Sequence, residues 1–292
     1  MHHRRWFYLL CAMAAIAALV LFAACGGDDE DSDSTAVPGT PSGTTASTAP
    51  ELSDGTLRVG SDIAYAPMEF FEEGTQNAQG LDVDLANALA EELGVRVDIV
   101  NIGFDAIIGA LKTQRFDILV SSMTVTDERS KEIDFIPYFS AGTDILVPGG
   151  NPKNIKGIEG LSGLTVAVQI ATIQVDQLDA ANKDLKAAGK PEINVLTFDQ
   201  NPLAVEQLRT GRADAVIADS PVVANDALLS DGDLEALGLA IEAAPYGIGV
   251  RKESTELKAA VEKALQTLQS NGTYDEILAK WGLQGGAIQS IE

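Results

Sequence analysis

Short runs typical of β-strands alternate with amphipathic helical runs from Thr56 onward, and this alternation constrains the fold more than any other feature. Four leucines between residues 81 and 93 recur every four residues and are followed by Gly94, which predicts a helix with one buried stripe. Polar and apolar residues alternate strictly over 95–99, which predicts a strand. Strands and helices that alternate at these lengths predict an α/β fold, with mainly parallel sheets flanked by helices.

The same patterns predict the remaining elements. Strands are expected at 57–60, 95–99, 116–120, 164–168, 193–198, 213–218 and 246–250. Helices are expected at 81–93, 105–115, 172–188, 202–210, 221–229, 254–270 and 274–281. Asp105 is expected to be the N-cap of the second helix. The Gly- and Pro-rich residues 147–152 interrupt the series and are expected to lead into a second lobe.

The N-terminus has the pattern of an export signal. A basic start at residues 2–5 precedes 6–24, which carry no charge, and Cys25 follows two alanines. This ending resembles the lipobox of bacterial lipoproteins, which implies that 1–24 are a signal peptide and that Cys25 carries the lipid. The mature protein would then be anchored by lipid outside the cytoplasmic membrane, at the cell surface or the periplasmic face. The alternative is an ordinary membrane-spanning anchor, since about 20 apolar residues can cross a bilayer.

A polar segment follows the cysteine. Residues 26–52 are Gly, Asp, Ser, Thr, Pro and Ala almost throughout and begin with an acidic run. Such a segment has too little apolar surface to offset the entropy cost of ordering, so residues 25–54 are expected to form a disordered tether.

Composition excludes several kinds of chemistry. Cysteine occurs only at positions 11 and 25 and histidine only at positions 2 and 3, so the region after Cys25 has neither. This excludes Ser-His-Asp and Cys-His nucleophiles and the usual zinc sites from that region, and we expect no metal or other cofactor. The net charge of −23 argues against nucleic acid as a partner, because binding to phosphates needs a basic face.

Four motifs occur in order along the chain. They are Gly60–Phe70 with Gly80–Leu85, Ser121–Arg129, Val168–Thr172 and Gly211–Asp219. Together they resemble the polar amino-acid family of bacterial extracellular solute-binding proteins, the capture subunits of ABC importers, over about residues 55–285. The resemblance implies a two-lobed, type II periplasmic-binding-protein-like fold. Lobe 1 would comprise 55–142 plus 246–292, lobe 2 would comprise 145–240, and two crossing strands would form the hinge.

The resemblance also implies a binding site for a zwitterion. Arg129 would bind the α-carboxylate of an amino acid, helped by Thr124, Thr172 and backbone amides around Ser122, and Asp219 would bind its α-ammonium group. The predicted ligand-binding residues are Asp62, Tyr65, Phe104, Ser121, Ser122, Thr124, Arg129, Gln169, Ala171, Thr172 and Asp219. From the residues alone, Arg129 could instead be a surface residue of the charged run 127–131, and Asp219 could be the N-cap of the next helix.

A second group of residues is expected to contact the ligand's side chain. Tyr65 and Phe104 match aromatic positions that cover it in the family, although aromatic residues are more often core. A carboxylate at Asp62 and an amide at Gln169 favour arginine, lysine, histidine or glutamine. One departure is Ile170-Ala171-Thr172, where many members have Gly-Ser/Thr-Thr, so one hydroxyl donor is lost. Met68 stands where Phe is usual.

The expected function is capture of a free amino acid by a monomer and its delivery to an ABC-type permease through hinge closure. One rival is an enzyme similar to the cyclohexadienyl dehydratases, which resemble this family. Such chemistry needs a positioned general acid, for which the sequence offers only Asp62 or Asp219. A second rival is a lipoprotein that senses its ligand and reports to a receptor.

Overall fold

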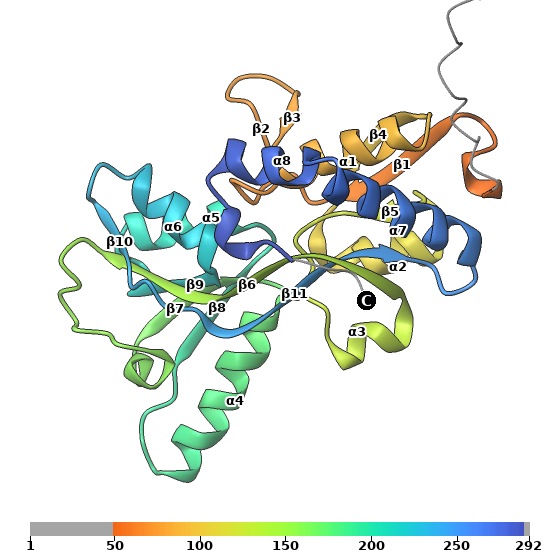
Figure 1. Ribbon diagram of the computed structural model, residues 1–292. Helices are drawn as coiled ribbons and strands as arrows, with labels where there is room; N and C mark the ends of the chain where they lie inside the picture. Colours follow the sequence, from red (N-terminus) through yellow and green to blue (C-terminus); the bar gives the residue numbers. More distant parts are fainter. Residues whose placement is uncertain (1–48, 289–292) are drawn as a thin grey trace, which may run out of the picture. The chain divides into compact units, whose positions relative to one another are not determined.

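The computed structural model describes residues 49–288. The predicted signal peptide, Cys25 and most of the predicted tether lie outside these residues. The main feature is a mixed sheet in the order β4-β1-β5-β11-β6-β9-β7-β8, with β10 paired to β6 (Figure 1). Its strands are β1 (Thr56–Ser61), β4 (Arg96–Asn101), β5 (Ile118–Leu119), β6 (Asp134–Pro148), β7 (Thr165–Gln169), β8 (Asn194–Phe198), β9 (Ala215–Asp219), β10 (Leu234–Ala236) and β11 (Ile241–Val250). A small hairpin joins β2 (Phe70–Phe71) to β3 (Ala78–Gln79).

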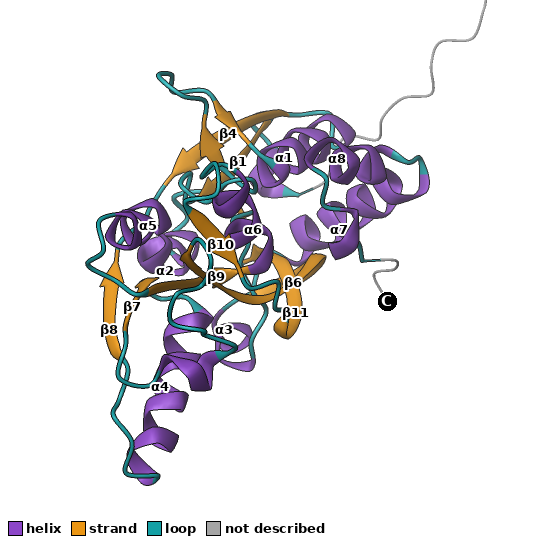
Figure 2. Ribbon diagram, turned by 90° about the vertical axis from the view of Figure 1, so that its left-hand side faces the viewer, coloured by secondary structure: helices purple, strands orange, loops and turns teal. Residues whose placement is uncertain are grey.

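Helices pack on the sheet throughout the described chain (Figure 2). The α-helices are α1 (Leu81–Glu92), α2 (Ile107–Lys112), α3 (Asp127–Glu132), α4 (Ile173–Ala187), α5 (Asn201–Arg209), α6 (Ser220–Leu228), α7 (Thr255–Ser270) and α8 (Thr273–Trp281). Single 3-10 turns occur at Pro50–Leu52, Phe104–Ala106, Ile158–Leu161 and Gln284–Gly286. Every predicted strand and helix is present, with its ends shifted by a few residues.

The leucine stripe behaves as its spacing predicts. Leu81, Leu85 and Leu89 are all buried on one side of α1. This side packs against α7 and α8, and the three helices lie side by side in both views (Figures 1 and 2). Burying each leucine contributes about 1.5–3 kcal/mol relative to leaving it exposed, so the stripe fixes α1 on the sheet.

The start of the second helix differs from the prediction. Asp105 lies inside the 3-10 turn Phe104–Ala106, and α2 begins at Ile107 with Ala106 at its N-cap position. The carboxylate of Asp105 was expected to accept a bond from the first turn, but the tighter 3-10 turn replaces that arrangement.

Two long strands connect the two ends of the sheet. β6 spans 15 residues and β11 spans 10, and they pair antiparallel along most of their length. β11 also pairs with β5, while β6 also pairs with β9, so the chain passes through this pair in each direction (Figure 1). We call β1, β4, β5, α1–α3, α7 and α8 the β1 half, and β7–β10 and α4–α6 the β7 half. Pairing inside each half is parallel in the main sheet, as predicted, and each antiparallel pair of that sheet involves β6 or β11.

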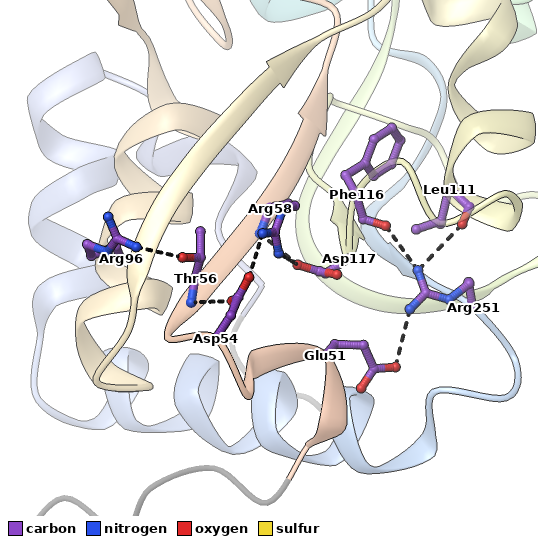
Figure 3. Close-up of polar contacts among 9 residues, drawn as sticks. All are labelled: Glu51, Asp54, Thr56, Arg58, Arg96, Leu111, Phe116, Asp117 and Arg251. Carbon is purple, nitrogen blue, oxygen red and sulfur yellow. Dashed lines mark hydrogen bonds and ion pairs between the residues drawn. The ribbon is translucent and has the colours of Figure 1, made fainter.

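The junction between the predicted tether and the domain is ordered. The tether was expected to continue to residue 54, but Ala49 and Leu52 are buried in the core. The buried guanidinium of Arg251, just after β11, lies 3.2 Å from Glu51 Oε1 and donates to the carbonyl oxygen of Phe116 at 3.0 Å (Figure 3). Apolar contacts and this ion pair offset the entropy cost of ordering the segment.

Loss of Arg251 should therefore destabilise the fold. We expect Arg251→Met to lower the free energy of unfolding by about 3–5 kcal/mol, because Glu51 and the backbone carbonyls lose their buried partner. Urea unfolding followed by circular dichroism would measure the change.

Arg58 offers a matched control, because it pairs with Asp54 on the surface beside the same junction (Figure 3). Arg58→Met should change the unfolding midpoint far less, since exposed ion pairs contribute little. Equal losses at the two positions would contradict a special role for Arg251.

Candidate ligand-binding site

A cavity lies where the carboxyl ends of strands from the two halves meet. Its wall is formed by Asp62, Tyr65, Glu69, Phe104, Ser121, Ser122, Thr124, Arg129, Gln169, Thr172, Ile173, Gln174 and Asp219. Asp62 directly follows β1, whereas Gln169 and Asp219 are the last residues of β7 and β9. The structure thus brings together every predicted site residue except Ala171. It adds Glu69, Ile173 and Gln174, to which the sequence analysis gave no role.

Arg129 is held in position by carbonyl groups. Its Nη1 donates to the oxygen of Thr124 at 2.8 Å, and its Nη2 donates to the oxygen of Ala171 at 2.9 Å. The guanidinium carbon lies 5.5 Å from the centre of the Phe104 ring. Burial lowers the pKa of Arg129, while the charge of Asp219 opposes this shift. Because both bonds go to neutral oxygens, the fixed positive charge is available to an anion in the cavity.

Asp219 faces the cavity from the other half and is buried. Its Oδ2 accepts a bond from the Tyr65 hydroxyl at 3.0 Å, and its Oδ1 accepts one from Gln174 Nε2 at 2.8 Å. It occupies the N-cap position of α6, but its side chain makes no capping bond there. Burial raises the pKa of Asp219, and the hydrogen bonds from Tyr65 and Gln174 hold that rise back. A buried carboxylate with neutral donors is a suitable partner for an ammonium group.

Asp62 and Gln169 form a polar contact between the halves. Gln169 Nε2 donates to Asp62 Oδ2 at 2.7 Å, so this amide is already engaged with protein. Asp62 Oδ1 is buried and accepts no hydrogen bond from the described residues. Burial raises the pKa of Asp62, and the Gln169 amide opposes the rise. Because an unpaired buried carboxylate oxygen is costly, this side of the cavity favours a ligand group that donates hydrogen bonds.

Two expected contacts to a ligand are occupied by the protein itself. The N–H of Ser122 was expected to serve a carboxylate, but it donates to Asp82 Oδ2 at 2.6 Å. Ser122 has a φ of +44°, and this left-handed turn directs its N–H toward α1 instead of the cavity. Ala171 also has a positive φ, and it contributes its carbonyl oxygen to Arg129 rather than a wall to the cavity.

Thr172 lies at the N-cap position of α4, as its place before the helix suggested. Its hydroxyl donates to the carbonyl oxygen of Gln169 at 2.8 Å, so that hydrogen is used locally. Ile173, the first residue of α4, stands beside it in the cavity wall. The carboxylate contact from this half therefore has fewer hydroxyl donors than the family pattern implies.

Glu69 is one of three residues in the cavity wall that the sequence did not predict. It is buried, and its Oε1 accepts a bond from the Ser121 hydroxyl at 2.7 Å. Burial raises the pKa of Glu69 well above its ordinary value, and neighbouring Asp82 raises it further. A glutamate directly after Pro67-Met68, inside the first motif, was the signal available in the sequence.

Three of these bonds link the halves across the cavity: Tyr65 to Asp219, Gln169 to Asp62, and Arg129 to Ala171. Within residues 49–288, no helix is long and apolar enough to cross a membrane. The same residues contain no group of three or more His, Cys, Asp or Glu placed to hold a metal ion.

Comparison with known proteins gives consistent matches. Residues 57–284 match the model of the bacterial extracellular solute-binding proteins, family 3. The arginine-binding protein ArgT of Corynebacterium glutamicum is 33% identical over 241 residues, which cover 80% of this chain and 76% of that protein. A solved ancestral arginine-binding protein bound to arginine is 38% identical, with a TM-score of 0.73 over 78% of this chain and 98% of that one. An ancestral amino acid-binding protein described as a precursor of cyclohexadienyl dehydratase is 39% identical, with a TM-score of 0.68 over 79% and 96% of the two chains.

Two carboxyls, the buried Asp82 and the half-buried Asp226, predict an unusual dependence of stability on pH. Burial raises the pKa of Asp82 to about 6 and that of Asp226 to about 6, both from 3.8. A carboxyl whose pKa is raised by folding binds its proton more tightly in the folded state, so its contribution to stability is lost as pH rises through about 6. We expect a higher urea unfolding midpoint at pH 5 than at pH 8; a lower midpoint at pH 5 would contradict this.

Two variants distinguish the effect of burial on this pH dependence from the effect of net charge. Asp226→Asn should reduce the difference between pH 5 and pH 8, because the amide has no proton to lose on raising the pH. Asp231→Asn removes the same charge from an exposed position and should leave the difference unchanged.

Proposed function

Because the chain belongs to family 3 of the bacterial extracellular solute-binding proteins, we propose that it captures a free amino acid outside the cytoplasmic membrane and delivers it to an ABC-type permease. The observation that carries the proposal is the placement of Arg129 and Asp219, which face one cavity from the two halves of the sheet. A fixed cation and a fixed anion are what an amino-acid zwitterion requires. The expected two-lobed fold is shown by the likeness to solved amino-acid-binding proteins.

The charges in the cavity favour a basic amino acid. Asp62 and Asp219 contribute carboxylates, and Arg129 contributes a guanidinium group. A ligand with one carboxylate and two cationic groups would balance them, which places arginine and lysine before histidine and glutamine. The free Oδ1 of Asp62 is the acceptor for the ligand's side chain. The relative named above as arginine-binding supports arginine.

Closure around the ligand would occur by bending of β6 and β11. We place lobe 1 at 55–142 plus 246–292 and lobe 2 at 145–240, with these strands as the hinge. A ligand held by both lobes shifts the population toward the closed form by the difference between its affinities for the two forms. The permease would then distinguish the loaded protein from the empty one by its closed form.

An enzyme on the same fold is the second candidate, because the raised pKa of Glu69 gives the cavity a group of the kind that general acids use. Against it, Ser121 bonds to Oε1 of Glu69, and the Ser122 hydroxyl contacts Oε2 at 3.4 Å. These contacts hold the carboxyl in the wall.

A sensor would use the same closure as a transport protein and would differ only in the partner that recognises the closed form. Capture of a permease by the loaded protein would favour transport, and capture of a receptor would favour the sensor.

Ligand binding can be tested by thermal unfolding of the purified full-length chain. The panel would contain the amino acids, ornithine, sugars and prephenate. A ligand at about a thousand times its dissociation constant stabilises a protein by about 4 kcal/mol, and we expect the largest rise in melting temperature with arginine or lysine. A rise with prephenate and its turnover would favour the enzyme, and no rise with any amino acid would contradict the proposal.

Variants of the site residues test whether the rise in melting temperature comes from binding in this cavity. Arg129→Ala and Asp219→Ala should each abolish the rise with arginine while the unliganded protein stays folded. Arg115→Ala, at an exposed position, is the control for loss of an arginine and should bind normally. Near-native binding by Arg129→Ala would contradict the assigned role.

We also propose that Cys25 is lipidated and that residues 1–24 are removed. The support is the apolar segment that ends in Ala23-Ala24-Cys25. In a bacterial host, Cys25→Ser should move the protein from the membrane fraction to the soluble exported fraction and abolish palmitate labelling. Unchanged labelling, or membrane attachment that survives the substitution, would favour a spanning anchor.

A further inference from the structure

Two buried carboxyls, those of Glu69 and Asp82, contact the turn Ser121–Ser122 in the cavity wall. Neither has yet been given a role in ligand capture. Glu69 follows the cis Ala66-Pro67 segment, and Asp82 lies in the first turn of α1. Both are 1% exposed. Their partners are hydroxyls and one backbone N–H, contributed by Ser121, Ser122 and Tyr138. The pair is therefore buried among neutral contacts.

The hydrogen bonds of Glu69 indicate where a proton lies. The N–H of Asp62 donates to Ser121 Oγ at 3.0 Å, so the hydrogen of that hydroxyl is directed to Glu69 Oε1. The other oxygen, Oε2, lies 3.4 Å from Ser122 Oγ. Ser122 Oγ in turn lies 3.1 Å from Asp82 Oδ2, so one hydroxyl contacts both carboxyls.

Asp82 accepts on both of its oxygens. The Tyr138 hydroxyl lies 2.8 Å from Oδ1 and 2.8 Å from Oδ2. The backbone N–H of Ser122 donates to Oδ2 at 2.6 Å. The 2.6 Å bond from the N–H is shorter than an ordinary bond between neutral groups, as is typical of an ionised acceptor.

Two carboxylates this close, buried among neutral groups, cannot both be ionised, because like charges in a poorly solvated place repel strongly. We propose that Glu69 and Asp82 hold one proton between them, on Glu69, and act together as positioning residues for the turn Ser121–Ser122. This inference rests on the proposed function, since it assigns a role within that binding site. The pKa directions agree with it: burial raises the pKa of Glu69 well above its ordinary value, while that of Asp82 is about 6.

The turn needs such support because of its backbone. Ser122 has a φ of +44°, a left-handed conformation that is unfavourable for a residue other than glycine. The bond from its N–H to ionised Asp82 stabilises this conformation. Thr124 and Arg129 follow the turn and line the cavity, so their placement depends on it. Tyr138 belongs to β6, which connects the same carboxyl to a strand shared by both halves.

The assignment of the proton has a consequence for ligand charge. With Glu69 neutral, the cavity presents the carboxylates of Asp62 and Asp219 and the cation of Arg129. The other titratable groups that face Glu69 are Asp62, Asp82 and Tyr65, and Tyr138 lies against Asp82. A role of Glu69 as a third anion for the ligand's cation is the competing explanation.

Glu69→Gln separates the two explanations. The glutamine carbonyl can accept from Ser121, while its amide nitrogen takes the place of the protonated oxygen and donates on the side of Ser122 and Asp82. We expect the dissociation constant for L-arginine, measured by calorimetry on the full-length chain, to stay within about twofold of wild type. If Glu69 binds the ligand as an anion, the affinity should instead fall about 10- to 100-fold, and the proposal would be wrong.

Two further variants, which remove hydrogen bonds of the pair, provide a comparison with Glu69→Gln. Glu69→Leu removes the acceptor for Ser121 and the donor to Asp82, so its affinity should fall about tenfold, and glutamine at this position is the rescuing variant. Asp82→Asn places an amide against two donors and should weaken binding by about 10- to 100-fold. Equal affinities of the Leu and Gln variants would contradict a positioning role, whether or not Asp82→Asn folds.

Infrared spectroscopy tests the proton without any ligand. The difference spectrum of wild type minus Glu69→Gln at pH 7.5 should contain the C=O stretch of a protonated carboxyl. A spectrum with no such band would overturn the assignment of the proton. If wild type binds no amino acid at all, the proposed function fails, and this band still decides whether the pair shares a proton.

Discussion

The antiparallel pairing of β6 with β11 is the interaction on which the other parts of the structure depend. One strand carries the chain from the β1 half to the β7 half, and the other carries it back, so their register fixes where the two sets of strand ends meet. The buried rings of Phe139 and Tyr246 pack across this pair with their centres 5.6 Å apart. Arg129 and Asp219 lie on opposite sides of the cavity, so their distance from each other follows from this pairing.

Burial of acidic groups next to the cavity has a structural cost and a functional use. Asp62 and Asp219 are held by neutral donors, and their pKa values are raised by burial. A ligand cation would relieve part of this cost, so the binding of the ligand and the stability of the protein are coupled. In the proposed function, these carboxylates would thus gain a charged partner from the ligand, since their hydrogen-bond partners in the fold are neutral groups.

Sequence patterns predicted the repetitive parts of the structure well, because spacing alone determines them. The stripe of α1 and the alternation of β4 depend on local periodicity. The family, which was predicted from four motifs in order, was confirmed by the match of residues 57–284 to the family model. No strand was predicted at β6, because Pro137 and Gly142 interrupt its pattern and only its partners reveal a strand. The engagement of the Ser122 N–H and the place of Glu69 depend on Asp82, which lies far from the turn in sequence, so no local pattern could predict them.

The ordered junction at residues 49–52 determines where mechanical load enters the domain. Any pull on the chain before Ala49 is carried through Leu52 in the core and through Glu51 to Arg251, at the end of β11. All of these contacts belong to the β1 half, so that half is the stationary part when the chain is held from its N-terminus. In the proposed hinge closure, the β7 half is therefore the part that would move about β6 and β11. Such a motion would leave the attachment at residues 49–52 in place, so a pull on the chain before Ala49 would not by itself open or close the cavity.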